Sequence, residues 1–352
     1  ALTVPDDISD KEIRKMVERL FVAADEDFNL DRLKLVGEKA VPFLIEALKD
    51  PRTQEVKFGE MNHISLASSP FERVCDLLEP FGPPAAVEPL IPFVDSEDKD
   101  FRKHAGRALG NIGTAECTEP VQELLSDEDD YVRSSTMYGI RDGMEANRCS
   151  REFLNSIFPT LIELLDKSDM SISGNTPRLL LTIDRDRAVP ILLSEKYFTP
   201  QNSQVDDIIE VMNELGYKIP RTKLLPFLEK VKPQIGSYPH ARQYSAALIA
   251  YAYNPDENAE AVFREAMEMP DSAAKPTRNP DRPRLKGEGK LTRVREAGAQ
   301  ALSILSGVTN AREFVMEQYD EQGFDGMTRP QRYYVAVFLY DAEVNNGGHS
   351  QY

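Results

Sequence analysis

Residues of the types that catalyse reactions or bind metals are few in this sequence and widely separated. Its 352 residues include 4 histidines and 3 cysteines, and none of these forms a His-x-x-x-His or a Cys-x-x-Cys pair. Metal sites built on helices or zinc ribbons usually show such short spacings. The sequence also contains no glycine-rich nucleotide loop and no Gly-x-Ser-x-Gly motif. We therefore expect no metal, no cofactor and no catalytic residue.

Two acidic runs have the composition of calcium-binding loops. One begins at Asp95 (Asp-Ser-Glu-Asp-Lys-Asp) and the other at Asp127 (Asp-Glu-Asp-Asp). Both lack the central glycine and the glutamate at position twelve of an EF-hand loop. Short Asp and Ser side chains also accept hydrogen bonds from the first amide groups of a helix. We interpret both runs as turns that stop one helix and cap the next.

The two acidic runs lie at nearly equivalent positions of a sequence repeat. Glu88-Pro89 recurs as Glu119-Pro120, and Phe101-Arg102 recurs as Val132-Arg133, at an offset of 31 residues. Apolar residues at helical spacing precede and follow each turn, which predicts two helical hairpins between residues 85 and 144. We expect Gly110 and Gly113 to end the second helix of the first hairpin. Neither helix has enough apolar surface to be stable alone, so the hairpins must stack.

This pattern resembles HEAT repeats: an apolar helix, an acidic turn, an apolar-Arg pair that opens the second helix, and then Ala-Leu-Gly at 108–110. The resemblance implies an all-α fold, a right-handed α-α superhelix whose second helices line the concave face. Less regular helical patterns continue on both sides, so we predict a HEAT-like solenoid over residues 1–327 with about seven hairpins. Residues 1–31 are expected to cap it, and a long connection is expected over 50–69.

The net charge of −17 is unevenly distributed over the predicted helices. The second helices together sum to about +1, so the acidity falls on the first helices, the turns and the cap. Arginine and tyrosine suit the recognition of acidic or planar groups. The candidate binding residues on the concave face are Arg102, Lys103, Arg107, Tyr138, Arg141 and Arg178. In this repeat type Arg102 and Arg133 also have a structural interpretation, as ion-pair partners of Asp95 or Asp127 in the turns.

Residues 271–293 form a basic insertion between two predicted helices. It carries 7 Lys and Arg residues against 3 Asp and Glu residues, and its prolines and glycines exclude a regular helix or strand. One interpretation is an arm that binds an acidic partner through Arg278, Arg282, Arg284 and Lys286. The other is a solvated loop whose positive charge partly offsets the negative charge of the scaffold. We expect it to fold back onto acidic side chains of the solenoid.

The end of the chain carries a second signature. Residues 328–352 predict a helix ending near Val344, followed by Asp-Ala-Glu-Val-Asn-Asn-Gly-Gly-x-x-Gln-Tyr across 341–352. This block resembles the opening of a bacterial domain family of unknown function. That family includes the Neisserial DNA-mimic protein, an acidic helical protein that binds DNA-binding proteins. Because the family's domain extends well beyond this block, we expect the start of a C-terminal domain that is either truncated at Tyr352 or vestigial.

Three functions are compatible with these features. The first is a non-enzymatic scaffold that holds a protein partner, of unknown identity, on the concave face. The second is DNA mimicry, in which the acidic surface occupies the DNA site of another protein. The third is an enzyme built on helical repeats, such as a HEAT-like bilin lyase; a HEAT-like DNA glycosylase is disfavoured because it needs a strongly basic groove. The three isolated cysteines and the lack of a long apolar run predict a cytoplasmic protein that binds neither membranes nor nucleic acid directly.

Overall fold

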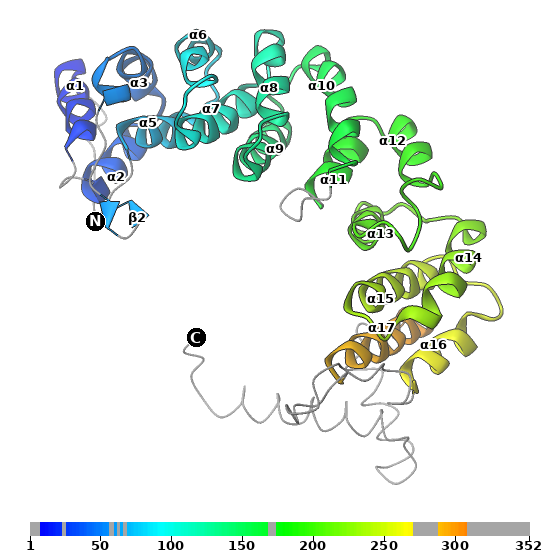
Figure 1. Cartoon of the computed structure of the whole chain (residues 1–352). Helices are drawn as coiled ribbons and strands as arrows, with labels where there is room; N and C mark the ends of the chain where they lie inside the picture. The colour runs from blue at the N-terminus through cyan, green and yellow to red at the C-terminus, as the bar shows by residue number, and fades with distance from the viewer. Residues whose placement is uncertain are drawn as a thin grey trace, which may run out of the picture. The chain divides into compact units, whose positions relative to one another are not determined.

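The computed structural model describes residues 8–22, 26–55, 60–61, 64–65, 69–167, 174–269 and 288–307. The chain divides into two compact units, residues 1–185 and residues 186–352. In each unit, helices alternate along the chain between two layers (Figure 1). The all-α fold predicted from the sequence is confirmed. The strands among the described residues are β1 (Glu60–Met61) and β2 (Ile64–Ser65), which pair as a short antiparallel hairpin.

Unit 1 begins with α1 (Asp10–Glu18) and α2 (Glu26–Val36). Its first-helix layer contains α3 (Val41–Leu48), α6 (Val87–Leu90), α8 (Thr118–Leu125) and α10 (Arg151–Leu164). Its second-helix layer contains α5 (Pro70–Leu78), α7 (Lys99–Ile112), α9 (Asp130–Glu145) and α11 (Asn175–Ile183). Each second helix packs against the next one, from α5 to α11 (Figure 1).

Unit 2 repeats this arrangement with three hairpins. Its first helices are α12 (Arg185–Leu192), α14 (Arg221–Val231) and α16 (Ala259–Met267). Its second helices are α13 (Val205–Glu214), α15 (Tyr238–Ala252) and α17 (Glu288–Ser306). Helix α15 packs against both α13 and α17, so the second helices again form a continuous layer.

The acidic turns work as the sequence predicts. Asp98 precedes α7 and accepts a hydrogen bond from the amide of Asp100 at 3.0 Å. Asp129 precedes α9 and accepts from the amide of Tyr131 at 2.9 Å. Each carboxylate satisfies at least one of the amide groups that the first turn of a helix leaves without a partner.

Three boundaries differ from those predicted. Helix α2 runs through residue 31, the expected end of the cap. The connection over 50–69 contains a short helix, α4 (Arg52–Glu55), and the β1–β2 hairpin. Helix α17 begins at Glu288, so the last residues of the basic insertion are helical. The predicted C-terminal domain over 328–352 lies outside the described residues.

The prediction that Gly110 ends α7 is wrong. The helix continues to Ile112, and Gly113 caps it in a left-handed conformation at φ 61°. Gly110 faces α9 instead. A Cβ atom at Gly110 would lie 2.8 Å from the carbonyl oxygen of Thr136 and from the amide nitrogen of Ile140. The glycine is therefore needed for the close approach of two helices and not for a turn.

Candidate functional site

Arg102 on α7 is held by the turn that precedes α7 and by the turn between α8 and α9. Its Nε and Nη2 atoms donate to the two carboxylate oxygens of Asp127, at 2.7 and 3.1 Å. Its Nη1 atom donates to the carbonyl oxygen of Ser96 at 2.8 Å. Only 14% of the Arg102 side chain and 9% of the Asp127 side chain are exposed. Arg102 thus pairs with an aspartate of a turn, and little of its guanidinium is left for a partner molecule.

Arg133 occupies the same position in the next hairpin. Its Nη1 atom donates to the carbonyl oxygens of Asp127 and Glu128, at 2.6 and 2.9 Å. Asp95 does not take the role predicted for it. It is exposed, and its carboxyl lies beside Glu123 and raises the pKa of that residue. At the repeat offset of 31 residues, the position of Asp127 corresponds to Ser96 and not to Asp95, so Asp95 lies one residue away from the equivalent position.

Arg107 connects three second helices. It donates to Glu79, at the end of α5, through Nε at 3.1 Å and Nη2 at 2.6 Å. The same Nη2 atom lies 3.3 Å from a carboxylate oxygen of Asp142 on α9. The Arg107 side chain remains 39% exposed. This bridge joins residues that are 28 and 35 positions from Arg107 in sequence, so no local pattern could reveal it.

The other predicted binding residues of α7 and α9 extend the same surface. Arg141 donates to Asp142 at 2.9 Å, and its guanidinium lies 4.9 Å from the centre of the Tyr138 ring. Lys103 lies 3.8 Å from Asp100 on its own helix and is 35% exposed. Arg178 lies on α11 and is partly exposed. The structure therefore brings Arg107, Tyr138 and Arg141 together, whereas Lys103 pairs locally.

His104 and Asp76 have shifted proton affinities on this surface. Burial, with Lys103 and Arg107 nearby, lowers the pKa of His104 to about 4, so its imidazole is neutral at pH 7. Its Nε2 atom lies 3.5 Å from Glu72. Desolvation, with Glu72 and Glu79 nearby, raises the pKa of Asp76 to about 6. Asp76 is exposed, so its carboxyl, with this raised pKa, is accessible to a partner.

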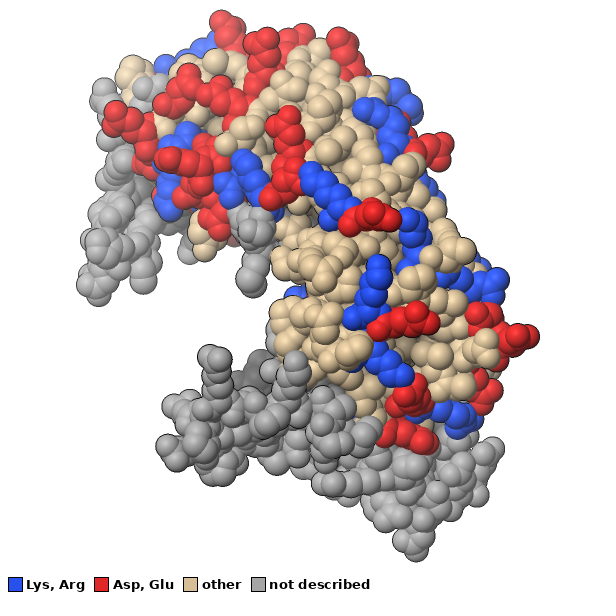
Figure 2. All heavy atoms as spheres, turned by 45° about the vertical axis from the view of Figure 1, so that its right-hand side comes forward, with Lys and Arg blue, Asp and Glu red and all other residues tan. Residues whose placement is uncertain are grey.

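We define the α5–α7–α9 surface by ten side chains that lie on these three helices or directly at their ends: Glu72, Asp76, Glu79, Lys103, His104, Arg107, Tyr138, Arg141, Asp142 and Glu145. Five are carboxylates and three are cations at neutral pH. The surface is therefore acidic, although its predicted binding residues are mostly basic. Acidic side chains also gather over unit 1, toward the top of the face in Figure 2, whereas basic and acidic ones alternate lower down.

The second-helix layer of unit 2 has its own charged cluster. Arg242 on α15 lies 2.8 Å from Asp206 and 3.2 Å from Asp207, both on α13. Only 3% of the Asp206 side chain is exposed, and desolvation raises its pKa to about 6 despite the arginine. Arg293 on α17 lies 3.8 Å from Glu210. These contacts join α13, α15 and α17 as Arg107 joins α5, α7 and α9.

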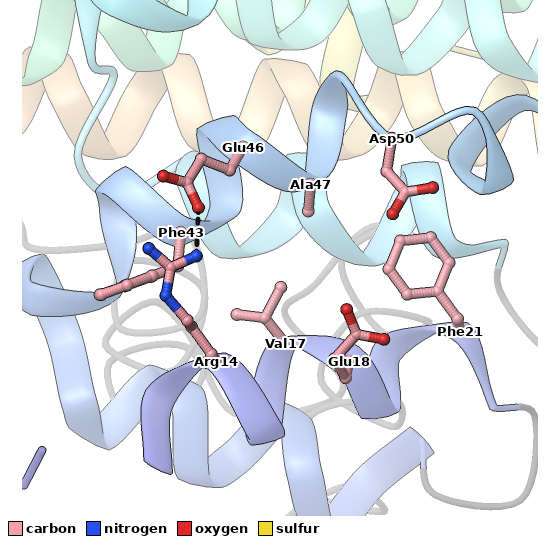
Figure 3. A pocket seen from close by; sticks show the side chains of 8 residues that line it. All are labelled: Arg14, Val17, Glu18, Phe21, Phe43, Glu46, Ala47 and Asp50. Atoms are coloured by element: carbon pink, nitrogen blue, oxygen red, sulfur yellow. Dashed lines mark hydrogen bonds and ion pairs between the residues drawn. The ribbon is translucent and has the colours of Figure 1, made fainter. Parts of the chain in front are cut away.

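A pocket of about 180 Å³ lies between α1 and α3 (Figure 3). Val17 and Ala47 point into its middle (Figure 3). At one end Arg14 pairs with Glu46 at 2.6 Å and stacks on Phe43, with 4.7 Å from its guanidinium to the ring centre. At the other end Arg52, which the figure does not draw, pairs with Glu18 and Asp50 and stacks on Phe21 at 4.3 Å. The carboxylates and aromatic rings that line this pocket are thus already paired with the protein's own arginines. The sequence did not predict this pocket.

Within the described part of the chain, no three His, Cys, Asp or Glu side chains are grouped so that they could hold a metal ion. No helix of that part is long and apolar enough to cross a membrane. The three cysteines are free. The four predicted contacts of the basic insertion, Arg278, Arg282, Arg284 and Lys286, lie outside the described residues, as does its predicted folding back.

Comparison with known families confirms both resemblances seen in the sequence. Residues 72–141 match the family of HEAT repeats. Residues 325–352 match the family described as DMP19-like protein. No curated protein matches the chain. The HEAT match extends from α5 into α9 and so covers most of the α5–α7–α9 surface.

Proposed function

We propose that this HEAT-repeat chain is a non-enzymatic scaffold that binds a protein partner through the α5–α7–α9 surface. The observation that supports the proposal most is the Glu79–Arg107–Asp142 bridge, which holds part-exposed charges in place across three helices. Side chains that are already ordered lose less entropy when a partner binds. Because carboxylates outnumber cations here, the partner presents basic groups to this surface.

The same geometry favours a protein over a nucleic acid as the partner. Binding to a phosphate backbone depends on lysine and arginine side chains that replace counterions. On this surface Arg107 and Arg141 already pair with carboxylates, at 2.6 and 2.9 Å. The chain as a whole has a net charge of −17, which repels phosphates.

The test compares charge reversals on the two layers. Asp76→Lys with Glu145→Lys changes exposed carboxylates of the second-helix layer, and Glu88→Lys with Glu119→Lys changes exposed carboxylates of the first-helix layer. Each full-length protein captures partners from a nuclease-treated lysate of the source cell, and the captured proteins are quantified by mass spectrometry. We expect proteins captured by the wild type and by the Glu88/Glu119 variant to be lost from the Asp76/Glu145 variant. Equal capture by all three proteins would contradict the proposal.

A second candidate function is DNA mimicry, in which the chain binds the DNA site of a DNA-binding protein. The match of residues 325–352 to the DMP19-like family supports it, together with the net charge of −17. The same capture experiment separates the two functions if bound proteins are eluted with a short DNA duplex. Under DNA mimicry the duplex releases the partner at constant salt, whereas a partner held by the scaffold alone is released by salt and not by DNA.

We also propose that the chain has no catalytic activity, because neither its sequence nor its described residues bring together a nucleophile, a base and a polar cavity. The alternative is a bilin lyase. We expect the absorption spectrum of a free bilin to stay unchanged when the full-length protein is added. A shifted or sharpened spectrum would contradict this expectation.

A further inference from the structure

A second pocket lies in unit 2, away from the α5–α7–α9 surface. It has a volume of about 210 Å³ and is formed by α14, α15 and α16. Helices α14 and α16 both pack against α15 but make few direct contacts with each other. In unit 1, by contrast, the first helices α8 and α10 pack together directly. The pocket is the space that the separation of α14 and α16 leaves above α15, lined on its apolar side by Leu225, Leu228 and Val262.

Tyr244 lines this pocket from α15 and has an unusual environment. Only 1% of the residue is exposed. Among the described residues its hydroxyl makes no hydrogen bond, and it is not one of the polar atoms that are fully cut off from solvent, so it borders the open space of the pocket. Desolvation, with Glu265 nearby, raises the pKa of Tyr244, so the hydroxyl stays protonated. A buried tyrosine hydroxyl usually finds a partner, and one that lacks it at the wall of a pocket points to a ligand that supplies it.

The rim of the pocket is charged and mostly acidic. Lys232 pairs with Glu265 at 2.6 Å across the gap between α14 and α16. Tyr251 donates its hydroxyl to Asp256 at 2.5 Å. Glu229 also lines the pocket, so three carboxylates face one cation. Such a rim favours a basic residue next to the group that enters the pocket.

We propose that this pocket binds the tryptophan side chain of a partner protein, with a lysine or arginine beside it in the partner's sequence. An apolar cavity of about 150 Å³ holds a benzene molecule. The larger volume here, about 210 Å³, suits one indole ring. The indole N–H donates to the oxygen of Tyr244, while the apolar side chains contact the ring. Tryptophan anchors in such pockets dominate the energy of many protein interfaces.

The chain contains no tryptophan, so a tryptophan peptide can be excited selectively in its presence. The probe is Ac-Lys-Trp-Lys-NH2, whose fluorescence anisotropy is followed while the full-length protein is added. The non-fluorescent peptide Ac-Lys-Leu-Lys-NH2 serves as competitor, because it has the same charge without the ring. We expect saturable binding of the tryptophan peptide that an equal concentration of the leucine peptide does not reverse.

Three variants locate the binding site. Val262→Phe and Leu225→Phe each fill the pocket and should weaken binding more than tenfold. Tyr244→Phe removes only the hydroxyl and should weaken binding by about two- to tenfold, the usual effect of one hydrogen bond. It should not lower the melting temperature, because the hydroxyl has no partner to lose. Tyr253→Phe, a change of the same kind on an exposed tyrosine just after α15, should leave binding unchanged.

Several results would overturn the proposal. One is the absence of any anisotropy change up to millimolar protein. Another is equal competition by the leucine peptide, which would mean that charge alone drives binding. A third is unchanged affinity in both filled-pocket variants with wild-type melting temperatures, which would place the peptide elsewhere. The α5–α7–α9 surface also attracts these cationic peptides, but binding there is competed equally by the leucine peptide and is unchanged in the filled-pocket variants. Failure of this proposal is therefore distinguishable from failure of the proposed function.

Discussion

Arg102 and Asp127 illustrate how one carboxylate can have two roles. The Asp127 side chain pairs with Arg102 and also accepts a hydrogen bond from the amide of Asp129 at 2.8 Å. It therefore joins two hairpins and shapes the turn of its own hairpin. Because both partners are mostly buried, the loss of one leaves a charge without compensation.

Asp127→Ala should lower the free energy of unfolding by about 3 kcal/mol, because it leaves the buried Arg102 without its partner. Asp95→Ala is the matched control. It changes an exposed aspartate of the equivalent turn and should stay within about 0.5 kcal/mol of the wild type. Urea denaturation of the three proteins followed by circular dichroism measures both effects. Similar losses in the two variants would show that the pair with Arg102 contributes little.

His104 makes stability depend on pH. Its pKa is about 4 in the folded protein and about 6.5 in the unfolded chain, so between these values the unfolded state binds more protons. The contribution of the neutral imidazole is fully present above pH 6.5 and is lost as the pH falls toward 4. Asp206 changes stability in the opposite direction, because its pKa is raised to about 6 in the folded protein. Between its unfolded pKa and about 6 the folded state binds more protons, so the contribution of Asp206 to stability rises as the pH falls.

The effect of His104 must therefore be measured as a difference between two proteins. We expect the wild type to lose stability relative to His104→Gln by about 1.4 kcal/mol per pH unit within this window. Denaturant unfolding at pH 7, 5.5 and 4.5 tests it. A difference that stays constant with pH would contradict the prediction.

At the scale of elements, the packing of α7 against α9 depends on glycine. Gly106 and Gly110 on α7, and Gly139 and Gly143 on α9, each stand four residues apart. A Cβ atom at any of these four glycines would come within 3 Å of an atom of the opposite helix. At Gly139 it would lie 2.1 Å from the carbonyl oxygen of Arg107. Side chains on either helix would push the two apart and open the bridge from Arg107 to Asp142.

Gly139→Ala should accordingly destabilise unit 1 by 2 kcal/mol or more, an order-of-magnitude estimate for overpacking. Helix propensity alone predicts the opposite sign, a gain of about 1 kcal/mol. Gly174→Ala is the control, because a Cβ there would meet nothing within 4 Å. Thermal unfolding by circular dichroism compares the two variants. A more stable Gly139→Ala protein would show that α7 and α9 can separate at little cost.

At the scale of the whole molecule, charge governs which partners can approach. The net charge of −17 produces a repulsive field for polyanions, and the arginines of the α5–α7–α9 surface are compensated by carboxylates. Non-specific binding to DNA needs several uncompensated lysines or arginines.

We therefore expect no mobility shift of a 30-base-pair duplex by the full-length protein at about 50 mM salt, where such binding is strongest. A basic DNA-binding protein of similar size serves as positive control. A shift that disappears with rising salt would reveal a basic surface outside the described residues, and the basic insertion would then be the first candidate.

The sequence by itself determined the features that depend on neighbours along the chain. The 31-residue repeat, the alternation of apolar helices and acidic turns, and the caps at Asp98 and Asp129 follow from local hydrogen bonding and helical spacing. These are enough to predict stacked hairpins, because a hairpin with one apolar face has to bury it against another. The C-terminal resemblance is likewise a property of consecutive residues.

Only the tertiary structure decided which charges meet and how closely helices approach. Asp127 and not Asp95 pairs with Arg102, and Glu79 and Asp142 converge on Arg107 from two other helices. The role of Gly110 and the unpartnered hydroxyl of Tyr244 depend in the same way on the distance between helices. That distance results from packing over the whole layer, and no short sequence pattern predicts it for residues about 30 positions apart.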